Sequence, residues 1–380
     1  MDATYGREMF ATERRPIRHL DVTLLLTTLA LSVIGLFMVY SATYRSLQAQ
    51  QLDPGTYLKR QIVWALFGVI LLLLCASFDY RFVKTYAGFT YGAMLLSLVF
   101  VRSPLGTSVK GSQRWFEFLC FQFTPSEYMK IAVIVMLAAY LAELRTTRLS
   151  LDETLRVTAI AAFPMLLVFL QPDVGTTIVI CAILVGTLVV AGARPRHLAV
   201  LALSAVVLIF LAFQMGVVKD YQIARLIGWL DPSSDPQSAG YNKAQAEIAV
   251  GSGGLAGRGY LHGTQTNLDF VPEQHTDFIF TVVGEEFGFL GAMFVVALFG
   301  VLVWRAFRIA LLSKDPFGTY LAAGIASMLA IEVFVNIGMS VGIMPITGIP
   351  LPFVSYGGSA MMANYIAIGL LLNVHMRRFK

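Results

Sequence analysis

Charged residues are scarce in this 380-residue chain: only 13% of its positions are Asp, Glu, Lys or Arg, whereas 57% are hydrophobic. A soluble domain typically has about a quarter of its residues charged, so this chain lacks the polar groups that would cover a water-exposed surface. The mean hydropathy of +0.71 agrees with this conclusion. These values exclude a soluble enzyme, a coiled coil and a disordered chain, and they predict a polytopic membrane protein.

Cysteine is also rare, with only Cys75, Cys120 and Cys181 in the whole sequence. The number is odd and two of the three lie in apolar runs, so neither a disulfide framework nor a cysteine metal site is expected. No His or Cys spacing predicts a metal site, although the sequence leaves open a divalent cation held by carboxylates. No cleavable signal peptide is expected, because the first apolar run, residues 22–40, is long enough to span a membrane.

Long apolar runs fill most of the chain. A hydrocarbon core of about 30 Å requires about 20 apolar residues per helix. We therefore predict an all-α fold that forms one membrane domain over residues 1–380, with ten transmembrane helices. Their expected positions are 22–41, 61–78, 86–101, 126–143, 157–170, 174–192, 198–217, 278–304, 317–340 and 359–376.

The positions of Lys and Arg predict the orientation. If the N-terminus is cytoplasmic, most of these residues fall in the inside segments, although the outside connections are much longer, as the positive-inside rule requires. Both termini are therefore predicted to be cytoplasmic, with residues 1–21 as a cytoplasmic N-terminal segment. The net charge of +5 is then a topology signal and does not indicate nucleic-acid binding.

Polar and irregular sequence collects in the predicted outer connections. The largest is residues 218–277, between the seventh and eighth spans, and connections without function are usually far shorter. Residues 111–115 and 171–176 add Gly, Pro, charged and aromatic residues on the same side. Residues 341–358 are rich in Pro and Gly and cannot form a regular helix. We expect this segment to line a cavity rather than form a surface turn, and we predict a functional site at the outer membrane surface.

Asp277 lies at the outer edge of the eighth predicted span. It is either a helix N-cap or a general base whose pKa is raised by partial desolvation at the membrane edge. The nearby Asp269 and Glu273 are expected to be solvated. His275 is either a proton relay or a loop residue that forms a hydrogen bond.

Glu127 and Lys130 are spaced i,i+3 at the start of the fourth span, so they can pair on one helix face. Charges within a span are costly and usually face a bundle interior or a polar cavity. The two alternatives are a structural ion pair and a role for Lys130 as a phosphate-binding cation.

Several other polar residues are candidates for the same site. Trp115 is either an interfacial belt residue or part of a pocket. Residues 251–259 are glycine-rich and either cradle a phosphate or form a flexible linker. Basic residues on the outer side are candidates to neutralise a diphosphate: Arg114, Arg258, Lys243 and Lys110. Polar residues within or beside spans are candidate coupling-ion ligands or pocket supports: Asp173, Glu285, Glu286, Glu332 and Asn336.

At these motifs the chain resembles the SEDS family, the proteins of shape, elongation, division and sporulation. The resemblance covers nearly the whole chain from the first span onward, and the run at residues 260–265 favours the elongation branch over the division branch. The motifs are Gly111-Ser-Gln-Arg-Trp115, Pro125-Ser-Glu-x-x-Lys130, Gln171-Pro-Asp-x-Gly-Thr176, Leu230-Asp-Pro-x-x-Asp-Pro236, the run from Gly251 to Gln265, Pro272-Glu-x-His-Thr-Asp-Phe-Ile-Phe280 and the run from Gly348 to Ser359.

The resemblance implies a ten-helix glycosyltransferase that polymerises lipid II into peptidoglycan glycan strands, outside the cytoplasmic membrane and without a certain cofactor. It implies that Asp277 is the essential catalytic residue and that Trp115 is a pocket residue. We add Arg114, Lys130, Glu127, Arg258 and Ser355 as predicted substrate-binding residues. The implied partners are lipid II, the growing glycan strand, membrane lipid and a class B penicillin-binding protein that supplies transpeptidase activity.

Three other functions stay open. A flippase or other transporter fits the spans and the intramembrane acids, but its site should lie near the midplane, often within an inverted repeat, and no convincing repeat is present. A division-specific polymerase of the same family is the nearest alternative. A non-catalytic scaffold would leave the concentration of acids, cations and glycines on one side unexplained.

Overall fold

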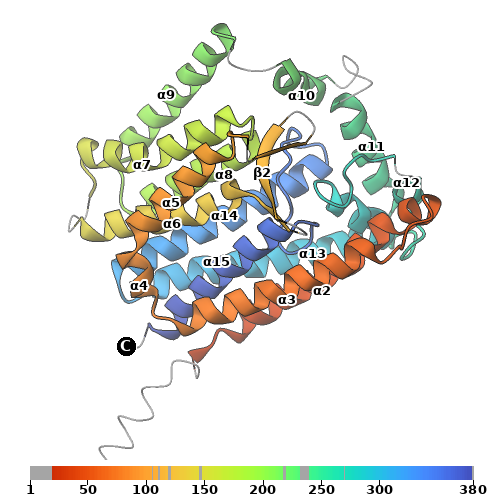
Figure 1. The fold of residues 1–380 in the computed structure, drawn as a ribbon, viewed down its shortest axis with the longest axis horizontal. Helices are drawn as coiled ribbons and strands as arrows, with labels where there is room; N and C mark the ends of the chain where they lie inside the picture. Colours follow the sequence, from red (N-terminus) through yellow and green to blue (C-terminus); the bar gives the residue numbers. More distant parts are fainter. Residues whose placement is uncertain are drawn as a thin grey trace, which may run out of the picture.

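The computed structural model describes residues 19–104, 106–109, 112–118, 121–144, 148–216, 220–231, 239–268 and 270–378. Within these ranges, every predicted span overlaps a helix (Figure 1). These helices are α2 (Val22–Ala49), α3 (Thr56–Ser77), α5 (Ala87–Phe100), α6 (Pro125–Glu143), α7 (Leu151–Leu170), α8 (Val174–Val190), α9 (Pro195–Gln214), α13 (Ile279–Leu312), α14 (Pro316–Ser340) and α15 (Gly358–Met376).

The helices differ in how well they fit a membrane. Among the described residues, seven helices are long and apolar enough to cross one, namely α2, α3, α6, α7, α13, α14 and α15. Three shorter apolar segments lie in α5, α8 and α9. The structure therefore supports a helical protein with several membrane spans, and the count of ten crossings stays a prediction.

The expectation of an all-α fold is wrong between α5 and α6. Three antiparallel strands lie there in the order β1 (Thr107–Val109), β2 (Ser112–Phe118) and β3 (Phe121–Phe123). In the register, Thr107 pairs with Trp115 and Phe116 pairs with Phe123. In β2, polar and aromatic residues partly alternate, which is a period-two strand pattern that a search for membrane spans overlooks.

The long connection between α9 and α13 is itself helical in part. It contains α10 (Asp220–Leu230), α11 (Ala239–Ser252) and the short α12 (Thr264–Asn267). α11 packs against α13, whereas α9 stands apart from the central bundle (Figure 1). A further short helix, α4 (Tyr80–Thr85), follows α3.

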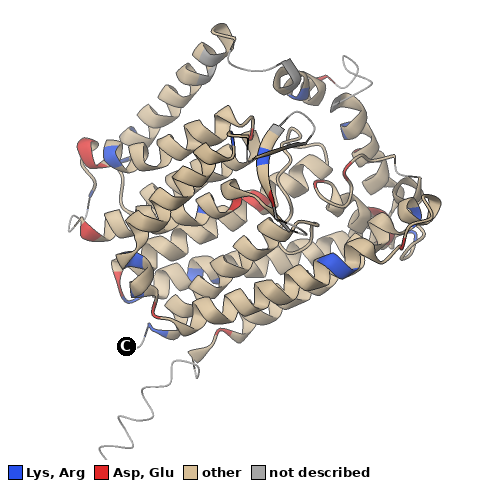
Figure 2. Cartoon of the chain, in the orientation of Figure 1, with Lys and Arg blue, Asp and Glu red and all other residues tan. Residues whose placement is uncertain are grey.

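The bundle core is formed by α14, which packs against α6, α8 and α13, and by α15, which packs against α3. Large apolar side chains are nevertheless exposed along the peripheral helices α2, α3 and α9. Figure 2 shows charged residues mostly at helix ends and in connections, while the helix middles are largely uncharged. This distribution is expected for a bundle whose outer surface contacts lipid.

Helix α13 is interrupted at Gly288, whose φ of 65° is non-helical. The glycine-rich loop replaces the lost helical hydrogen bonds. Arg258 N donates to Glu285 O (3.0 Å) and Gly259 N to Glu286 O (3.0 Å), while Phe289 N donates to Gly254 O (2.9 Å). In a membrane protein, backbone groups at such a break must be satisfied within the protein.

This close approach explains why the loop is glycine-rich. A Cβ atom at Gly288 would lie 2.3 Å from Gly257 N, and a Cβ at Gly257 would lie 2.1 Å from Glu286 O. Residues 251–259 therefore pack backbone to backbone on α13. The sequence left open a phosphate cradle or a flexible linker. This packing is not that of a flexible linker, and the phosphate cradle stays a prediction.

The predicted cytoplasmic segments meet at one end of the bundle. Arg305 on α13 forms an ion pair with Asp21 just before α2, and Nδ1 of His375 on α15 lies 3.9 Å from the same carboxylate. The Tyr80 hydroxyl donates to Asp315 at the start of α14 (2.6 Å). The beginning of α2 and the end of α15 thus lie on the same side.

Candidate catalytic site

Asp277 is the last but one residue of the turn that leads into α13. The N-cap residue of α13 is Phe278, so the N-cap alternative for Asp277 is not what the structure shows. Asp277 is half-buried, and its backbone N–H donates to Glu273 O (3.0 Å). Its backbone oxygen accepts from Nδ2 of Asn336 on α14 (2.8 Å). Both the backbone N–H and the backbone oxygen of Asp277 are therefore held by hydrogen bonds.

Residues 341–357 of the segment predicted to be irregular, 341–358, contain no helix in the structure, and α15 begins at Gly358. Ile349 and residues 351–355 are buried, whereas Ile343 and Gly348 are exposed, so only the second half of the segment runs inside the protein. Gly348 has a φ of +76°, and a Cβ built on it would lie 3.4 Å from Oδ2 of Asp277. The segment therefore borders the Asp277 carboxylate.

Ser355 shapes this segment. Its buried hydroxyl oxygen accepts from Leu351 N (2.9 Å), and its carbonyl oxygen accepts from Nε2 of the buried Gln61 (3.0 Å). These contacts lie within the protein, and the substrate-binding role of Ser355 stays a prediction. Gln61 is a supporting residue that the sequence did not single out, because a lone glutamine at the edge of an apolar run has no distinguishing pattern.

Aromatic rings surround His275, two residues before Asp277. The His275 ring centroid lies 5.1 Å from Tyr57 and 5.8 Å from Tyr356, and Tyr356 N donates to His275 O (2.9 Å). Burial raises the pKa of the Tyr356 phenol, although the nearby Arg60 acts in the opposite direction. The phenol therefore stays protonated at neutral pH. Sequence reasoning missed both tyrosines.

Arg114 on β2 binds the turn at residues 171–173. Its Nε donates to Gln171 O (2.9 Å), its guanidinium also donates to Pro172 O, and Nη1 lies 3.8 Å from Oδ1 of Asp173. Asp173 in turn caps α8 by accepting from Thr176 N (3.1 Å). The half-buried Trp115 follows Arg114 on the same strand. The arginine thus joins the β-sheet to the start of α8.

The same turn reaches the segment next to Asp277. A Cβ at Gly175 would lie 2.8 Å from the Ile349 side chain and 3.0 Å from Thr347 O. After this segment, at the start of α15, the Ser359 hydroxyl donates to O of Gln122 in β3 (2.6 Å). The described contacts therefore bring together the four stretches that the sequence predicted to converge.

Lys130 lies between two carboxylates. Its Nζ is 2.5 Å from Oε1 of Glu332 on α14 and 2.8 Å from Oε2 of Glu127. The lysine side chain is 3% exposed. Of the two alternatives for Lys130, the structural ion pair describes these contacts, and a role in binding phosphate stays a prediction.

Other candidates contact the glycine-rich loop and the long connection before α13. Arg258 is exposed on the glycine-rich loop, where Nε donates to Ser252 O (3.1 Å). Lys243 donates to Trp229 O (2.9 Å). The buried Glu285 accepts from the backbone of Gln265 (2.8 Å) and Thr266 (2.9 Å), and therefore supports the loop before α13.

Glu286 accepts from Ser41 and from Leu261 N, so it also supports the loop. Lys110 and Asp269 lie outside the described residues. Within the part of the chain that the structure describes, no group of three or more His, Cys, Asp or Glu residues could hold a metal ion.

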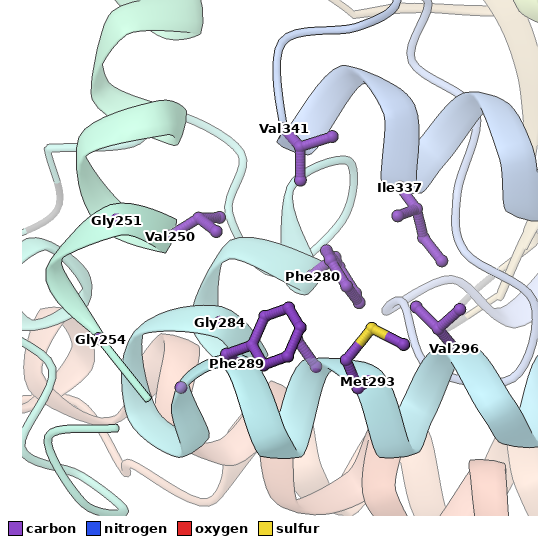
Figure 3. Close-up of a pocket in the computed structure, with 12 residues that line it drawn as sticks. Val250, Gly251, Gly254, Phe280, Gly284, Phe289, Met293, Val296, Ile337 and Val341 are labelled. Carbon is purple, nitrogen blue, oxygen red and sulfur yellow. The ribbon is translucent and has the colours of Figure 1, made fainter. Parts of the chain in front are cut away.

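An apolar cavity of about 350 Å³ lies between α11, α13 and α14 (Figure 3). Phe280, Phe289, Met293 and Ile337 line it with other apolar residues and several glycines. Phe280 follows Asp277 by three residues in the chain, and Asp277 itself is not among the residues that line the cavity. A half-buried carboxylate suits acid–base chemistry, and an apolar cavity suits the apolar part of a ligand.

A family model named FTSW_RODA_SPOVE and described as a cell cycle protein matches residues 22–380. The chain is 39% identical over 366 residues to the peptidoglycan glycosyltransferase MrdB of Escherichia coli K12, covering 95% of this chain and 94% of that protein. It is 37% identical over 371 residues to the probable peptidoglycan glycosyltransferase FtsW of Geobacter metallireducens, covering 97% and 98%.

Two solved structures have the same fold. One is a chain from work on the structural coordination of polymerization and crosslinking by a peptidoglycan synthase complex, with a TM-score of 0.80, 30% identity and coverage of 95% of this chain and 99% of that chain. The other is the rod shape determining protein RodA of Thermus thermophilus, with a TM-score of 0.70, 29% identity and coverage of 95% and 98%.

Proposed function

This chain belongs to the family of FtsW, RodA and SpoVE cell cycle proteins, and we propose that it polymerises lipid II into glycan strands at the outer face of the cytoplasmic membrane. It is a peptidoglycan glycosyltransferase, as its relatives MrdB and FtsW are named. Within the family, we assign it to cell elongation and shape maintenance. The similarity to RodA and MrdB supports this choice over a division-specific role.

The observation that carries the catalytic assignment is the position of Asp277. Its carboxylate lies beside Gly348, where the turn before α13 meets the irregular segment. Gly175 near the start of α8 packs against Thr347 and Ile349 of the same segment, and Arg114, the neighbour of Trp115 on β2, binds the turn before α8. This convergence supports Asp277 as the general base and Trp115 as a pocket residue.

The proposed reaction is a direct displacement at the anomeric carbon. The attacking sugar 4-hydroxyl gives its proton to Asp277 while its oxygen forms the new glycosidic bond. The bond to the polyprenyl diphosphate breaks, and the diphosphate leaves with the electron pair. A single displacement converts an α-linked donor into a β-linked product. Arg114, Lys130 and Arg258 are proposed to stabilise charge on the diphosphate, with Glu127 and Ser355 as supporting residues.

The proposed orientation places both termini in the cytoplasm and residues 218–277 outside. The ion pair of Arg305 with Asp21 and the proximity of His375 support it, because they join the start of α2 to the ends of two later helices. The polyprenyl tail is proposed to enter the apolar cavity of α11, α13 and α14, since Phe280 links that cavity to the turn that carries Asp277.

The test is polymerisation of labelled lipid II by the purified protein in liposomes. We expect polymer from the wild type and none from Asp277→Asn, which keeps the size of the side chain but removes the base. Asp277→Glu is expected to retain little activity, because an added methylene displaces the carboxylate. Thermal unfolding of each variant checks its fold. Polymerisation by a well-folded Asp277→Asn protein would contradict the general-base role, and transport of lipid II without polymer would identify a flippase.

A further inference from the structure

Asn336 connects the two segments that meet at Asp277. It lies on α14 and its side chain is fully buried. Its Nδ2 donates to the backbone oxygen of Asp277 (2.8 Å) and to the backbone oxygen of Ile349 (2.7 Å). Only the NH₂ end of the amide can donate to two carbonyl oxygens, so these bonds fix its orientation.

The two carbonyl groups belong to distant parts of the chain. Asp277 precedes Asn336 by 59 residues and Ile349 follows it by 13. One amide therefore holds the turn before α13 against the irregular segment. Gly348, the residue before Ile349, borders Oδ2 of Asp277. The distance between the Asp277 carboxylate and residues 348–349 therefore depends on the two hydrogen bonds that Asn336 donates.

The amide is not fully satisfied in this position. Among the described residues, Oδ1 of Asn336 is buried without a hydrogen-bond partner. Burying an unpaired acceptor costs free energy. If the side chain at position 336 only filled space, an apolar residue there would make the folded protein more stable. The two donated bonds are the feature that an apolar residue could not supply.

We infer that Asn336 is a positioning residue for the transferase reaction: its two donated bonds hold the Asp277 carboxylate at the distance from residues 348–349 that proton abstraction requires. It acts through Asp277 and does not contact the substrate. The inference rests on the proposed function of Asp277 as the base. A shift of about 1 Å in a catalytic group can reduce a rate roughly 100-fold, so loss of these bonds should reduce kcat.

Asn336→Asp tests this directly, because it keeps the shape of the side chain and replaces the NH₂ group with an oxygen that repels both carbonyl groups. The matched control is Asn373→Asp on α15. Nδ2 of the buried Asn373 also donates to two carbonyl oxygens, those of Cys75 (2.6 Å) and Phe78, at the other end of the bundle. Each variant loses two hydrogen bonds from one NH₂ group to two carbonyl oxygens, and only Asn336→Asp loses them next to Asp277.

Lipid II polymerisation and thermal unfolding are measured for both proteins. Oδ1 of Asn373 accepts from Nε of Arg377 (2.8 Å), so the new carboxylate of Asn373→Asp would pair with a cation and that variant should lose less thermal stability. We expect a kcat about 100-fold lower for Asn336→Asp with KM within about twofold of the wild type, and a kcat within about threefold of the wild type for Asn373→Asp. Equal losses of kcat in the two variants, or a loss expressed only in KM, would overturn the inference. If Asn336→Asp does not fold, Asn336→Ser, which keeps one donor, replaces it.

A double variant separates this inference from the proposed function. In the Asp277→Asn background, adding Asn336→Asp should not lower any residual activity further, because both changes remove the same catalytic step. A further loss in that background would show that Asn336 acts independently of Asp277. If Asp277→Asn is fully active, the proposed general base fails. If it is inactive while Asn336→Asp behaves like Asn373→Asp, only the positioning inference fails.

Discussion

Nζ of Lys130 on α6 lies 2.5 Å from Oε1 of Glu332 on α14, and both side chains are buried. Glu127, one turn before Lys130, places a second carboxylate 2.8 Å from the same nitrogen. Charged groups within membrane helices are costly and usually pair with one another inside the bundle. This cluster therefore joins two helices of the core through charge as well as through packing.

We predict that Lys130→Met destabilises the protein strongly, because it leaves two buried carboxylates without their cation. Removing one partner of a buried ion pair typically costs about 3–5 kcal/mol. The double variant Lys130→Met/Glu332→Gln should recover part of this loss. Thermal unfolding in detergent measures both effects. Arg156→Ala is the control, since Arg156 pairs with Asp152 at an exposed position, where an ion pair contributes at most about 1 kcal/mol.

The same experiment distinguishes the two roles predicted for Lys130. A Lys130→Met protein as stable as the wild type, but with a raised KM for lipid II, would indicate a phosphate-binding cation. A large loss of stability, partly restored by Glu332→Gln, would indicate a structural ion pair.

At the break in α13, we predict that Gly288→Ala is destabilising. With φ 65° and ψ −163°, Gly288 occupies a backbone region that is essentially limited to glycine and costs other residues about 1–3 kcal/mol, and the new Cβ would lie 2.3 Å from Gly257 N, which adds to the cost. Gly300→Ala on the same helix is the control, because a Cβ there meets nothing within 4 Å and alanine favours helix by about 0.5–1 kcal/mol. Relative to the wild type, Gly288→Ala should lower the midpoint of thermal unfolding and Gly300→Ala should raise it. Equal stabilities would contradict the backbone packing of the glycine-rich loop on α13.

The positions of the helices could be predicted from sequence because a membrane span is a local property. Every predicted span overlaps a helix, and the Pro- and Gly-rich run is non-helical over residues 341–357, since both features depend on neighbouring residues alone. The β-sheet was missed because its strands are short and their pattern is weak. The break at Gly288 was missed because its compensating hydrogen bonds come from another segment.

The candidate site was only partly accessible to the same reasoning. The place of Asp277 at the end of a polar connection left a helix cap and a general base open, and the family resemblance favoured the base. The contacts that surround Asp277 could not be predicted, because Asn336 and Gly348 reach it from distant segments. Arg114 was expected to face a diphosphate, and its guanidinium donates to the carbonyl oxygens of Gln171 and Pro172. Such pairings depend on tertiary packing, which one sequence does not specify.

The orientation in the membrane can be tested with single cysteines in a background without Cys75, Cys120 and Cys181. We predict that Leu268→Cys, an exposed position in the long connection, reacts with an impermeant thiol reagent on cells with a permeable outer envelope. Arg81→Cys, at an exposed position after α3, should react only after the membrane is opened. The reverse pattern would invert the topology and would place Asp277 on the cytoplasmic side.

The last prediction concerns a partner, which we propose to be a class B penicillin-binding protein with a single membrane span. The chain resembles a component of a synthase complex described as coordinating polymerization and crosslinking, which supports this proposal. Uncross-linked glycan strands bear no load, so a cross-linking enzyme must act close to the polymerase. The exposed apolar faces of the peripheral helices offer surfaces on which a membrane helix could pack.

We expect the transpeptidase to co-purify with this protein in mild detergent and to raise its rate of lipid II polymerisation. A partner can raise the rate only if it binds the active shape of the site more tightly than the inactive shape. Such binding would bias the position of the segment that carries Gly348 relative to the turn that carries Asp277. A transpeptidase variant without its membrane helix is the control and should neither co-purify nor activate. Unchanged polymerisation rates with the full-length transpeptidase, together with no co-purification, would contradict the prediction.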